Sequence, residues 1–132
     1  MTGRVHVKVP AQPAYLRLGR LVAAGLAGEC GFTVDEVDEL RIAVDELIHL
    51  MAQESVGDEI ELEYRVHDDT INVLGSRSGV YLRPEIDPLV AEILDAAADS
   101  WEVTAASNSI HFAVTKHRRW GGGATSFPGP GP

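Results

Sequence analysis

The feature that most constrains the fold of this chain is a change of hydrophobic period after Gly57. From residue 59 to residue 66, apolar and charged residues alternate in the segment EIELEYRV, which predicts a strand with one buried face. The segment HDDT then predicts a turn, and INVLG predicts a strand that returns beside the first. The same alternation occurs at residues 5–9, and in a last hairpin over residues 101–103 and 110–114.

Two other segments carry simple helical signals. Residues 14–30 hold apolar residues near helical spacing, and Gly28 and Gly31 weaken and end this helix. The residues near helical spacing are Leu18, Leu21, Val22, Gly25 and Leu26. A shorter helix over DPLVAEILDAAAD begins with Asp87 as its cap and Pro88 at its first position.

The most hydrophobic helix follows a capping box in the segment TVDE. Thr33 caps this helix, and Glu36, three residues later, reaches back to it. Apolar residues then recur with helical spacing, which predicts a helix buried over much of its circumference. The stripe consists of Val37, Leu40, Val44, Leu47 and Met51.

The order of the predicted elements is β-α-α-β-β-α-β-β. Hairpins with helices between them predict an α+β fold, a two-layer sandwich with helices on one face of a mostly antiparallel sheet. Residues 75–87 contain Gly, Ser, Arg and Pro, and we expect them to form a loop. We assign residues 1–119 to one domain and the Gly- and Pro-rich residues 120–132 to a flexible tail.

Composition narrows the class of function. The chain of 132 residues suits a single domain, and its net charge of −9, with 11 Lys and Arg, disfavours direct binding of nucleic acid. It has no apolar block typical of a signal peptide or a membrane span, so we expect a cytoplasmic protein without membrane contact. The single Cys30 cannot form an internal disulfide, and no Cys and His spacing is typical of a metal site.

Polar residues inside the hydrophobic helix are the first candidates for chemistry. The segment AVDELIHLM places Asp45, Glu46 and His49 among apolar neighbours. Glu46 and His49 are three residues apart and share a helical face, a pair that is more often a solvated edge than a metal site. The alternative is that Glu46 acts as a general base.

Basic residues and one Gly/Ser segment are further candidates. Arg17 and Arg20 lie in the first helix, where their stems cover the helix edge or their guanidinium groups contact an acidic partner. The segment GSRSG at residues 75–79 is more typical of a turn than of a phosphate site. The cluster KHRR at residues 116–119 is interpreted as a solvated strand end.

Taken together, these residues indicate a function more specifically than any one of them does. The segment GFTVDEVDELRIAVDELIHLM matches a family motif, gF-(T/S)-x-(D/E)-x-x-(D/E)-(L/I)-x-(L/I)-A-V-S-E-A-x-x-N-A. The matching residues are Gly31, Phe32, Thr33, Asp35, Leu40, Ala43, Val44 and Glu46. From about residue 5 to residue 118 the chain resembles the anti-sigma factor serine kinases of the Bergerat-fold (GHKL) ATPase superfamily. The resemblance implies a histidine-kinase-like ATPase fold.

The resemblance also implies a nucleotide site that is degenerate here. Glu46 takes the position of the catalytic base, but the asparagine that holds Mg²⁺ falls at Leu50, which has no metal-binding oxygen. In the motif D-x-G-x-G, Gly75 replaces the adenine-binding aspartate, Arg77 replaces the first glycine, and Gly79 is kept. We therefore expect no cofactor, and ATP with Mg²⁺ only if other residues rebuild the site.

The phosphate lid of the family is altered as well. Its motif G-x-G-L corresponds to PEIDPLVAEIL, where both glycines are absent, Leu89 matches the leucine, and Asp87 adds negative charge. Each lost contact is worth on the order of 1–3 kcal/mol, so the three losses together lower nucleotide affinity by roughly three to six orders of magnitude.

The partners follow from the same resemblance. In the family an arginine on the first helix contacts the sigma factor and the competing anti-anti-sigma (STAS) protein, and this position falls at Arg20, with Arg17 nearby. We predict a non-catalytic or weakly nucleotide-binding anti-sigma-like regulator, a homodimer that binds a sigma factor or an anti-anti-sigma protein. One alternative is an active serine kinase with Glu46 as base and His49 or Asp45 holding Mg²⁺, and another is a dimerisation module unrelated to sigma factors.

Overall fold

The computed structural model describes residues 2–52, 59–78, 85–106 and 108–119. The strands are β1 (Thr2–Pro10), β2 (Glu59–His67), β3 (Thr70–Ser78), β4 (Ser100–Ala106) and β5 (Ser109–His117). The helices are α1 (Pro13–Glu29), α2 (Val34–Ala52) and α3 (Pro88–Ala97). The predicted order β-α-α-β-β-α-β-β is confirmed.

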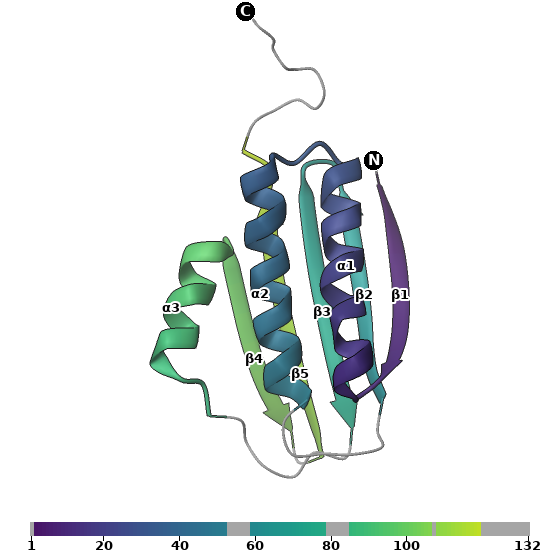
Figure 1. The fold of residues 1–132 in the computed structure, drawn as a ribbon, viewed down its shortest axis with the longest axis vertical. Coiled ribbons are helices and arrows are strands. Elements are labelled where there is room, and N and C mark those ends of the chain that lie inside the picture. The colour runs from purple at the N-terminus through teal and green to yellow at the C-terminus, as the bar shows by residue number, and fades with distance from the viewer. Residues whose placement is uncertain (1, 53–58, 79–84, 107, 120–132) are drawn as a thin grey trace, which may run out of the picture.

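The strands form one sheet in the order β1-β2-β3-β5-β4, with every neighbouring pair antiparallel. All three helices lie on the same side of this sheet (Figure 1). α1 packs over β1 and β2, α2 packs over β3 and β5, and α3 lies beside α2 and β4. The predicted α+β two-layer sandwich is therefore confirmed, and the core lies between its layers.

The buried face of α1 is not the one that Leu18 and Leu21 mark. Leu18 and Leu21 are 41% and 54% exposed. The buried residues are Leu16, Gly19, Ala23 and Ala27, most of them small. A Cβ at Gly19 would collide with Ile48 of α2, so the helix approaches its neighbours closely at a residue without a side chain.

A hydrogen bond fixes this close approach. The hydroxyl of Tyr64 on β2 donates to the backbone oxygen of Gly19 over 2.8 Å. Burial raises the pKa of Tyr64, so the phenol stays protonated and remains a donor.

The start of α2 is built as predicted. The backbone N–H of Glu36 donates to Oγ1 of Thr33 over 3.1 Å, and the N–H of Thr33 donates to Oε1 of Glu36 over 2.9 Å. These two bonds complete the capping box. Four of the five stripe residues are buried, and Val37 is half-buried.

The prediction of a loop from residue 75 is wrong for its first four residues. β3 continues to Ser78, because Gly75 pairs with Phe112 and Arg77 pairs with Ile110 on β5. Residues 85–87 are irregular, and α3 begins at Pro88 with its cap as predicted, since Oδ1 of Asp87 accepts from the N–H of Leu89 over 2.8 Å. Residues 79–84 and the tail at 120–132 lie outside the described residues.

Candidate functional site

α2 presents the polar residues that the sequence singles out. Glu46 is half-buried and makes no hydrogen bond or ion pair with the rest of the described chain. Leu50, one turn later at the position of the metal-binding asparagine, is 8% exposed. His49 is exposed, and its Nδ1 lies 2.8 Å from the backbone oxygen of Asp45. Glu46 is thus the one member of this group with a free carboxylate next to the core.

β3 carries the positions that match the adenine-binding motif. Buried residues alternate along β3, so Gly75 and Arg77 both lie on the side that faces the helices. A Cβ at Gly75 would collide with the ring of Phe112. Arg77 is 1% exposed, and its Nη1 donates to the backbone oxygen of Met51, near the end of α2, over 2.7 Å. Side chains of this chain fill the helix side of β3 at both positions.

The other positions that match nucleotide motifs of the family are those of the phosphate lid and the last glycine of the adenine motif. Leu89, at the leucine of the lid motif, is 63% exposed near the start of α3. The carboxylate of Asp87 caps that helix. Gly79 lies outside the described residues, so the structure says nothing of the one glycine that the motif keeps.

The candidate partner residues lie on α1. Nη1 of Arg20 contacts Oδ1 of Asp45 on α2 over 3.1 Å, and the two side chains are 36% and 28% exposed. Nδ1 of His49 lies 3.6 Å from the same carboxylate oxygen. Arg17 is exposed one turn earlier. Arg20 is therefore held at the surface of the α1–α2 pair by a carboxylate, and does not merely cover the helix edge.

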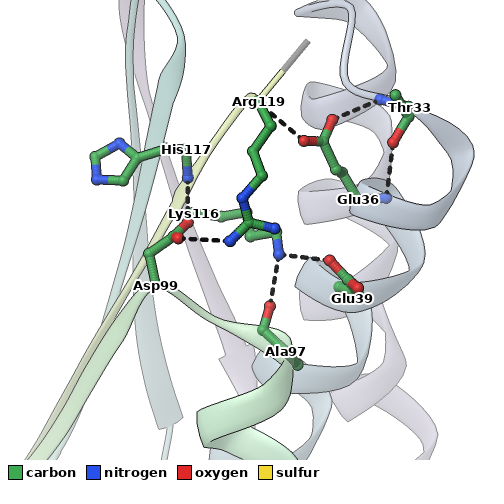
Figure 2. A network of polar contacts seen from close by, with 8 residues as sticks. All are labelled: Thr33, Glu36, Glu39, Ala97, Asp99, Lys116, His117 and Arg119. Atoms are coloured by element: carbon green, nitrogen blue, oxygen red, sulfur yellow. Dashed lines mark hydrogen bonds and ion pairs between the residues drawn. The ribbon is translucent and has the colours of Figure 1, made fainter.

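The basic cluster at residues 116–119 is not a solvated strand end. Lys116 is 1% exposed, and its Nζ donates to Oε1 of Glu39 over 2.6 Å and to the backbone oxygen of Ala97 over 2.9 Å. Figure 2 shows this ammonium group between α2 and the end of α3. The prediction fails because Lys116 falls in phase with the buried residues Phe112 and Val114 of β5. The period-2 pattern would have revealed this.

Two other residues of the cluster, His117 and Arg119, form hydrogen bonds with Glu36 of α2 and with Asp99, which precedes β4 (Figure 2). The backbone N–H of Arg119 donates to Oε2 of Glu36 over 2.7 Å, and its Nη2 donates to Oδ1 of Asp99 over 2.9 Å. The N–H of His117 donates to the other oxygen of Asp99 over 2.7 Å. Burial raises the pKa of Asp99, but this bond and the charge of Arg119 outweigh it, and the pKa lies below its ordinary value.

Two shallow hollows lie on the face of the sheet that carries no helix. One is lined by Lys8, Glu59, Glu61, Ser76 and Ser78. The other includes His6, Glu63, Leu74 and His111. Within the described residues, no three His, Cys, Asp or Glu side chains come together as metal ligands would. No helix in the same part of the chain is long and apolar enough to cross a membrane.

Curated proteins with related sequences are serine-protein kinases. The chain is 36% identical over 84 residues to the serine-protein kinase RsbW of Listeria innocua, covering 60% of this chain and 53% of that protein. It is 34% identical over 79 residues to RsbW of Bacillus subtilis, covering 57% and 49%. The predicted resemblance is confirmed. The chain spans about half the length of these relatives, and no protein-family model matches it.

A solved structure shows the same fold. The crystal structure of the RsbU and RsbW domains of Rv1364c from Mycobacterium tuberculosis matches with a TM-score of 0.67. The match covers 88% of this chain and 32% of that chain, at 11% sequence identity. The likeness therefore extends over nearly all of the α+β domain described above.

Proposed function

We propose that this chain is a cytoplasmic, anti-sigma-factor-like transcription regulator that acts by binding other proteins and not by phosphorylating them. Its partner is a sigma factor or an anti-anti-sigma protein of the STAS type. Its nucleotide site is degenerate. The resemblance to the RsbW kinases supports the partner class, and the contacts at the family's nucleotide positions support the loss of catalysis.

The observation that carries this proposal is the filled helix side of β3. Adenine recognition in the family needs an aspartate where this chain has Gly75, and the ring of Phe112 occupies the space beside that glycine. Two positions further, the guanidinium of Arg77 is buried against the end of α2. A bound base would have to displace both side chains from the core, and well-packed interiors resist such rearrangement.

The residues near Glu46 do not fit Mg²⁺ either. Leu50 is buried and has no oxygen to offer the ion. Asp45 is engaged by Arg20 at 3.1 Å, and Nδ1 of His49 is directed to a backbone oxygen. These contacts support a site that has lost the metal together with the nucleotide.

Calorimetric titration with Mg²⁺-ATP tests the degenerate site. We expect no binding to the purified chain, because three groups of contacts that the family uses are absent. RsbW of Bacillus subtilis, which is named a serine-protein kinase, is the positive control under the same conditions. Micromolar affinity of this chain for Mg²⁺-ATP would contradict the proposal.

Arg20 is the residue through which we propose partner binding. Its single bond to Asp45 leaves further N–H donors in the guanidinium fork, which suits a carboxylate on a partner. Arg17 lies one turn away on the same helix and offers a second contact. Asp45 holds the side chain of Arg20 in place, which lowers the entropy lost when a partner binds.

Affinity purification with mass spectrometry tests this surface. The wild-type chain is expected to recover a sigma factor or a STAS protein from cells of its source. Arg20→Ala is expected to lose that protein and Arg17→Ala to recover less of it. Arg41→Ala, which removes an exposed arginine with a similar 3.1 Å ion pair to Asp38, is the matched control. Recovery of neither class of protein by any bait would favour an interaction module unrelated to sigma factors.

The homodimer implied by the resemblance is part of the proposal. Sedimentation velocity measures it directly, with a dimer expected at twice the 14.2 kDa of one chain. A single monomeric species at micromolar protein would contradict it. That result would leave the other parts of the proposal standing.

One observation favours a second candidate, an active serine kinase. Glu46 is half-buried and, among the described residues, without a hydrogen-bonding or ionic partner, so its carboxylate is free to accept a proton from a substrate hydroxyl. The relatives are named serine-protein kinases. Transfer of labelled phosphate from ATP to a STAS protein, lost on Glu46→Gln, would support this candidate against the first.

A further inference from the structure

α3 carries apolar residues on two of its sides. Leu94 and Ala97 are buried and form the side that faces the core. Leu89, Ile93 and Ala96 form a second, outer stripe, because spacings of four and three residues keep them on one side of a helix. Leu89 is 63% exposed, Ala96 is exposed and Ile93 is half-buried. The outer stripe is therefore apolar surface that the fold leaves accessible.

The outer stripe faces away from the sheet. Nε1 of Trp101 on β4 donates to Oδ1 of Asp95 over 2.7 Å, so the Asp95 side of α3 is turned toward the sheet. Ile93 precedes Asp95 by two residues, which is about 200° around a helix. Ile93 therefore lies on the opposite side of α3, at the outer surface of the helix layer. Figure 1 shows α3 at the border of that layer, beside α2.

α2 adds a carboxylate beside α3. Glu39 accepts from the Lys116 ammonium, which also donates to the oxygen of Ala97, so this side of α2 faces the end of α3 (Figure 2). Glu46 follows Glu39 by seven residues and lies on the same side of α2. Since Glu46 forms no ion pair with the described residues, its carboxylate is free to attract a cation on a partner.

The surface around the outer stripe is acidic. Residues 85–99 contain five Asp and Glu and no Lys or Arg. Glu85 and Glu92 are exposed and, like Glu46, form no ion pair with the described part of the chain. An apolar stripe among unpaired carboxylates is complementary to a helix whose apolar residues are flanked by Lys or Arg.

A second copy of α3 fits the outer stripe poorly. Packing one outer stripe on another would bring Glu85 and Glu92 of both chains into one interface. Like charges placed together in an interface cost free energy. The same carboxylates disfavour nucleic acid and anionic membranes, whose surfaces carry phosphate charge.

We propose that the outer stripe of α3 binds an amphipathic helix of a partner protein, with apolar residues every three or four positions and Lys or Arg beside them. Burial of the apolar residues supplies affinity, and the unpaired carboxylates select a basic helix. Arg20 contacts Asp45 on the side of α2 that faces α1, so the outer stripe is a separate surface. The proposal goes beyond the proposed function, because it needs neither Arg20 nor a bound nucleotide.

Fluorescence anisotropy with labelled peptides tests the proposal on the full chain at physiological ionic strength. The peptide LKKIAKKLKKIAKK, which has an apolar helical stripe and basic flanks, is expected to bind. The peptide LEEIAEELEEIAEE reverses the charge, and KLKAKIKAKLKIKK has the composition of the first peptide without a helical stripe. Both are expected to bind at least about tenfold more weakly.

One pair of variants tests the apolar stripe. Leu89→Asp is expected to weaken binding of LKKIAKKLKKIAKK at least about tenfold, because it removes the most exposed apolar side chain of the stripe. Val34→Asp is the matched control, since Val34 is 77% exposed in the first turn of α2, as Leu89 is in the first turn of α3. This control makes the same change in charge and is expected to change affinity less than about twofold.

A second pair of variants tests the carboxylates. Glu85→Lys with Glu92→Lys is expected to weaken binding of the same peptide about tenfold, since two attractions become repulsions. Glu29→Lys with Glu102→Lys changes the net charge by the same amount at exposed residues of α1 and β4. This control is expected to change affinity less than about threefold. Circular dichroism confirms that each variant is folded.

Three results would overturn the proposal. The first is absence of LKKIAKKLKKIAKK binding at millimolar peptide. The second is equal binding of the two basic peptides, or equal effects of a variant pair and its control, which would reduce the interaction to net charge. The third is a dimer in sedimentation that Leu89→Asp converts to a monomer, which would assign the outer stripe to a second copy of the chain.

Discussion

At the scale of single residues, close approach of the backbone decides which side of α1 is buried. Gly19 lies against Ile48 and accepts a hydrogen bond from Tyr64, whereas Leu18 remains 41% exposed. Hydrophobicity alone marks Leu18 as the core residue and passes over Gly19. A glycine carries no hydrophobic signal, so this contact is not readable from the helical pattern.

Replacing Gly19 by alanine is expected to destabilise the fold by overpacking. The matched control is Gly25→Ala in the same helix, where a Cβ meets no atom within 4 Å. Both changes gain the same helix propensity, so their difference isolates the collision with Ile48. We expect Gly19→Ala to be less stable than Gly25→Ala by about 1–3 kcal/mol in urea denaturation. If the two variants are equally stable, α1 can move away from Ile48 without loss of folding free energy, and the prediction is wrong.

Lys116 gives a second prediction at this scale. Lys116→Met keeps the aliphatic volume but leaves the oxygen of Ala97 without its donor and Glu39 without its cation. We expect a loss of about 1–3 kcal/mol in the free energy of unfolding. Lys8→Met, at a more exposed pair of 3.7 Å, is expected to change stability by less than about 0.5 kcal/mol. If both variants change the free energy of unfolding by a similarly small amount, the attraction between Lys116 and Glu39 only offsets the cost of their desolvation.

At the scale of elements, period and capping predict most of the fold. The capping box of α2, the Asp87 cap of α3 and the alternation of β2 are local signals, and each is confirmed by a hydrogen bond or by the strand register. β3 is the exception, because Gly75 and Ser76 look like a loop in sequence and become a strand by pairing with β5. Pairing partners far along the chain decide such cases, and composition does not report them.

The junction between α3 and β4 gives a prediction about pH. Asp99 receives hydrogen bonds from His117 and Arg119, and its pKa is lowered from 3.8. A lowered pKa in the folded state means that the unfolded chain binds the proton more tightly. The stabilisation is therefore present above pH 3.8 and is lost as the pH falls through the lower, folded value.

Asp99→Asn tests this dependence. The variant is expected to be less stable than the wild type at pH 7. It is also expected to lose less stability than the wild type between pH 5 and pH 3. Thermal unfolding, measured at intervals of about half a pH unit, gives both comparisons. Thr104→Ala on the adjoining strand β4 is an exposed control that keeps every carboxylate. Parallel pH profiles of wild type and Asp99→Asn would contradict the assignment.

At the scale of the whole molecule, the fold is predictable and the site only in part. The sequence locates Glu46 and Leu50 one turn apart on α2, and the structure adds that Glu46 is half-buried and Leu50 buried. The filling of the β3 face by Arg77 and Phe112 escapes prediction, because it depends on groups from β3, β5 and α2 that meet only in the folded chain. The partners of residues 116–119 escape prediction in the same way, although the period-2 pattern does place Lys116 on the buried face of β5.

Those contacts predict where the chain can be shortened. Lys116 binds Glu39 and Ala97, the Nη1 of Arg118 donates to the oxygen of Cys30 over 2.7 Å, and the N–H of Arg119 donates to Glu36. A chain ending at residue 115 loses all of these bonds, and we expect it to lose at least about 3 kcal/mol of stability or to fail to fold. A chain ending at residue 119 keeps them and is expected to unfold within about 0.5 kcal/mol of the full chain.

Urea denaturation of the three lengths separates two views of the C-terminal part. If residues 120–132 only extend from a domain that ends at residue 119, the two longer chains share one midpoint. If the chain ending at residue 119 is destabilised by more than about 1 kcal/mol, the last residues contact the fold and the domain boundary is wrong. The stability of the chain that ends at residue 115 tests whether Lys116 and the residues after it stabilise the packing of the two layers, because every other element of the core is still present in that chain.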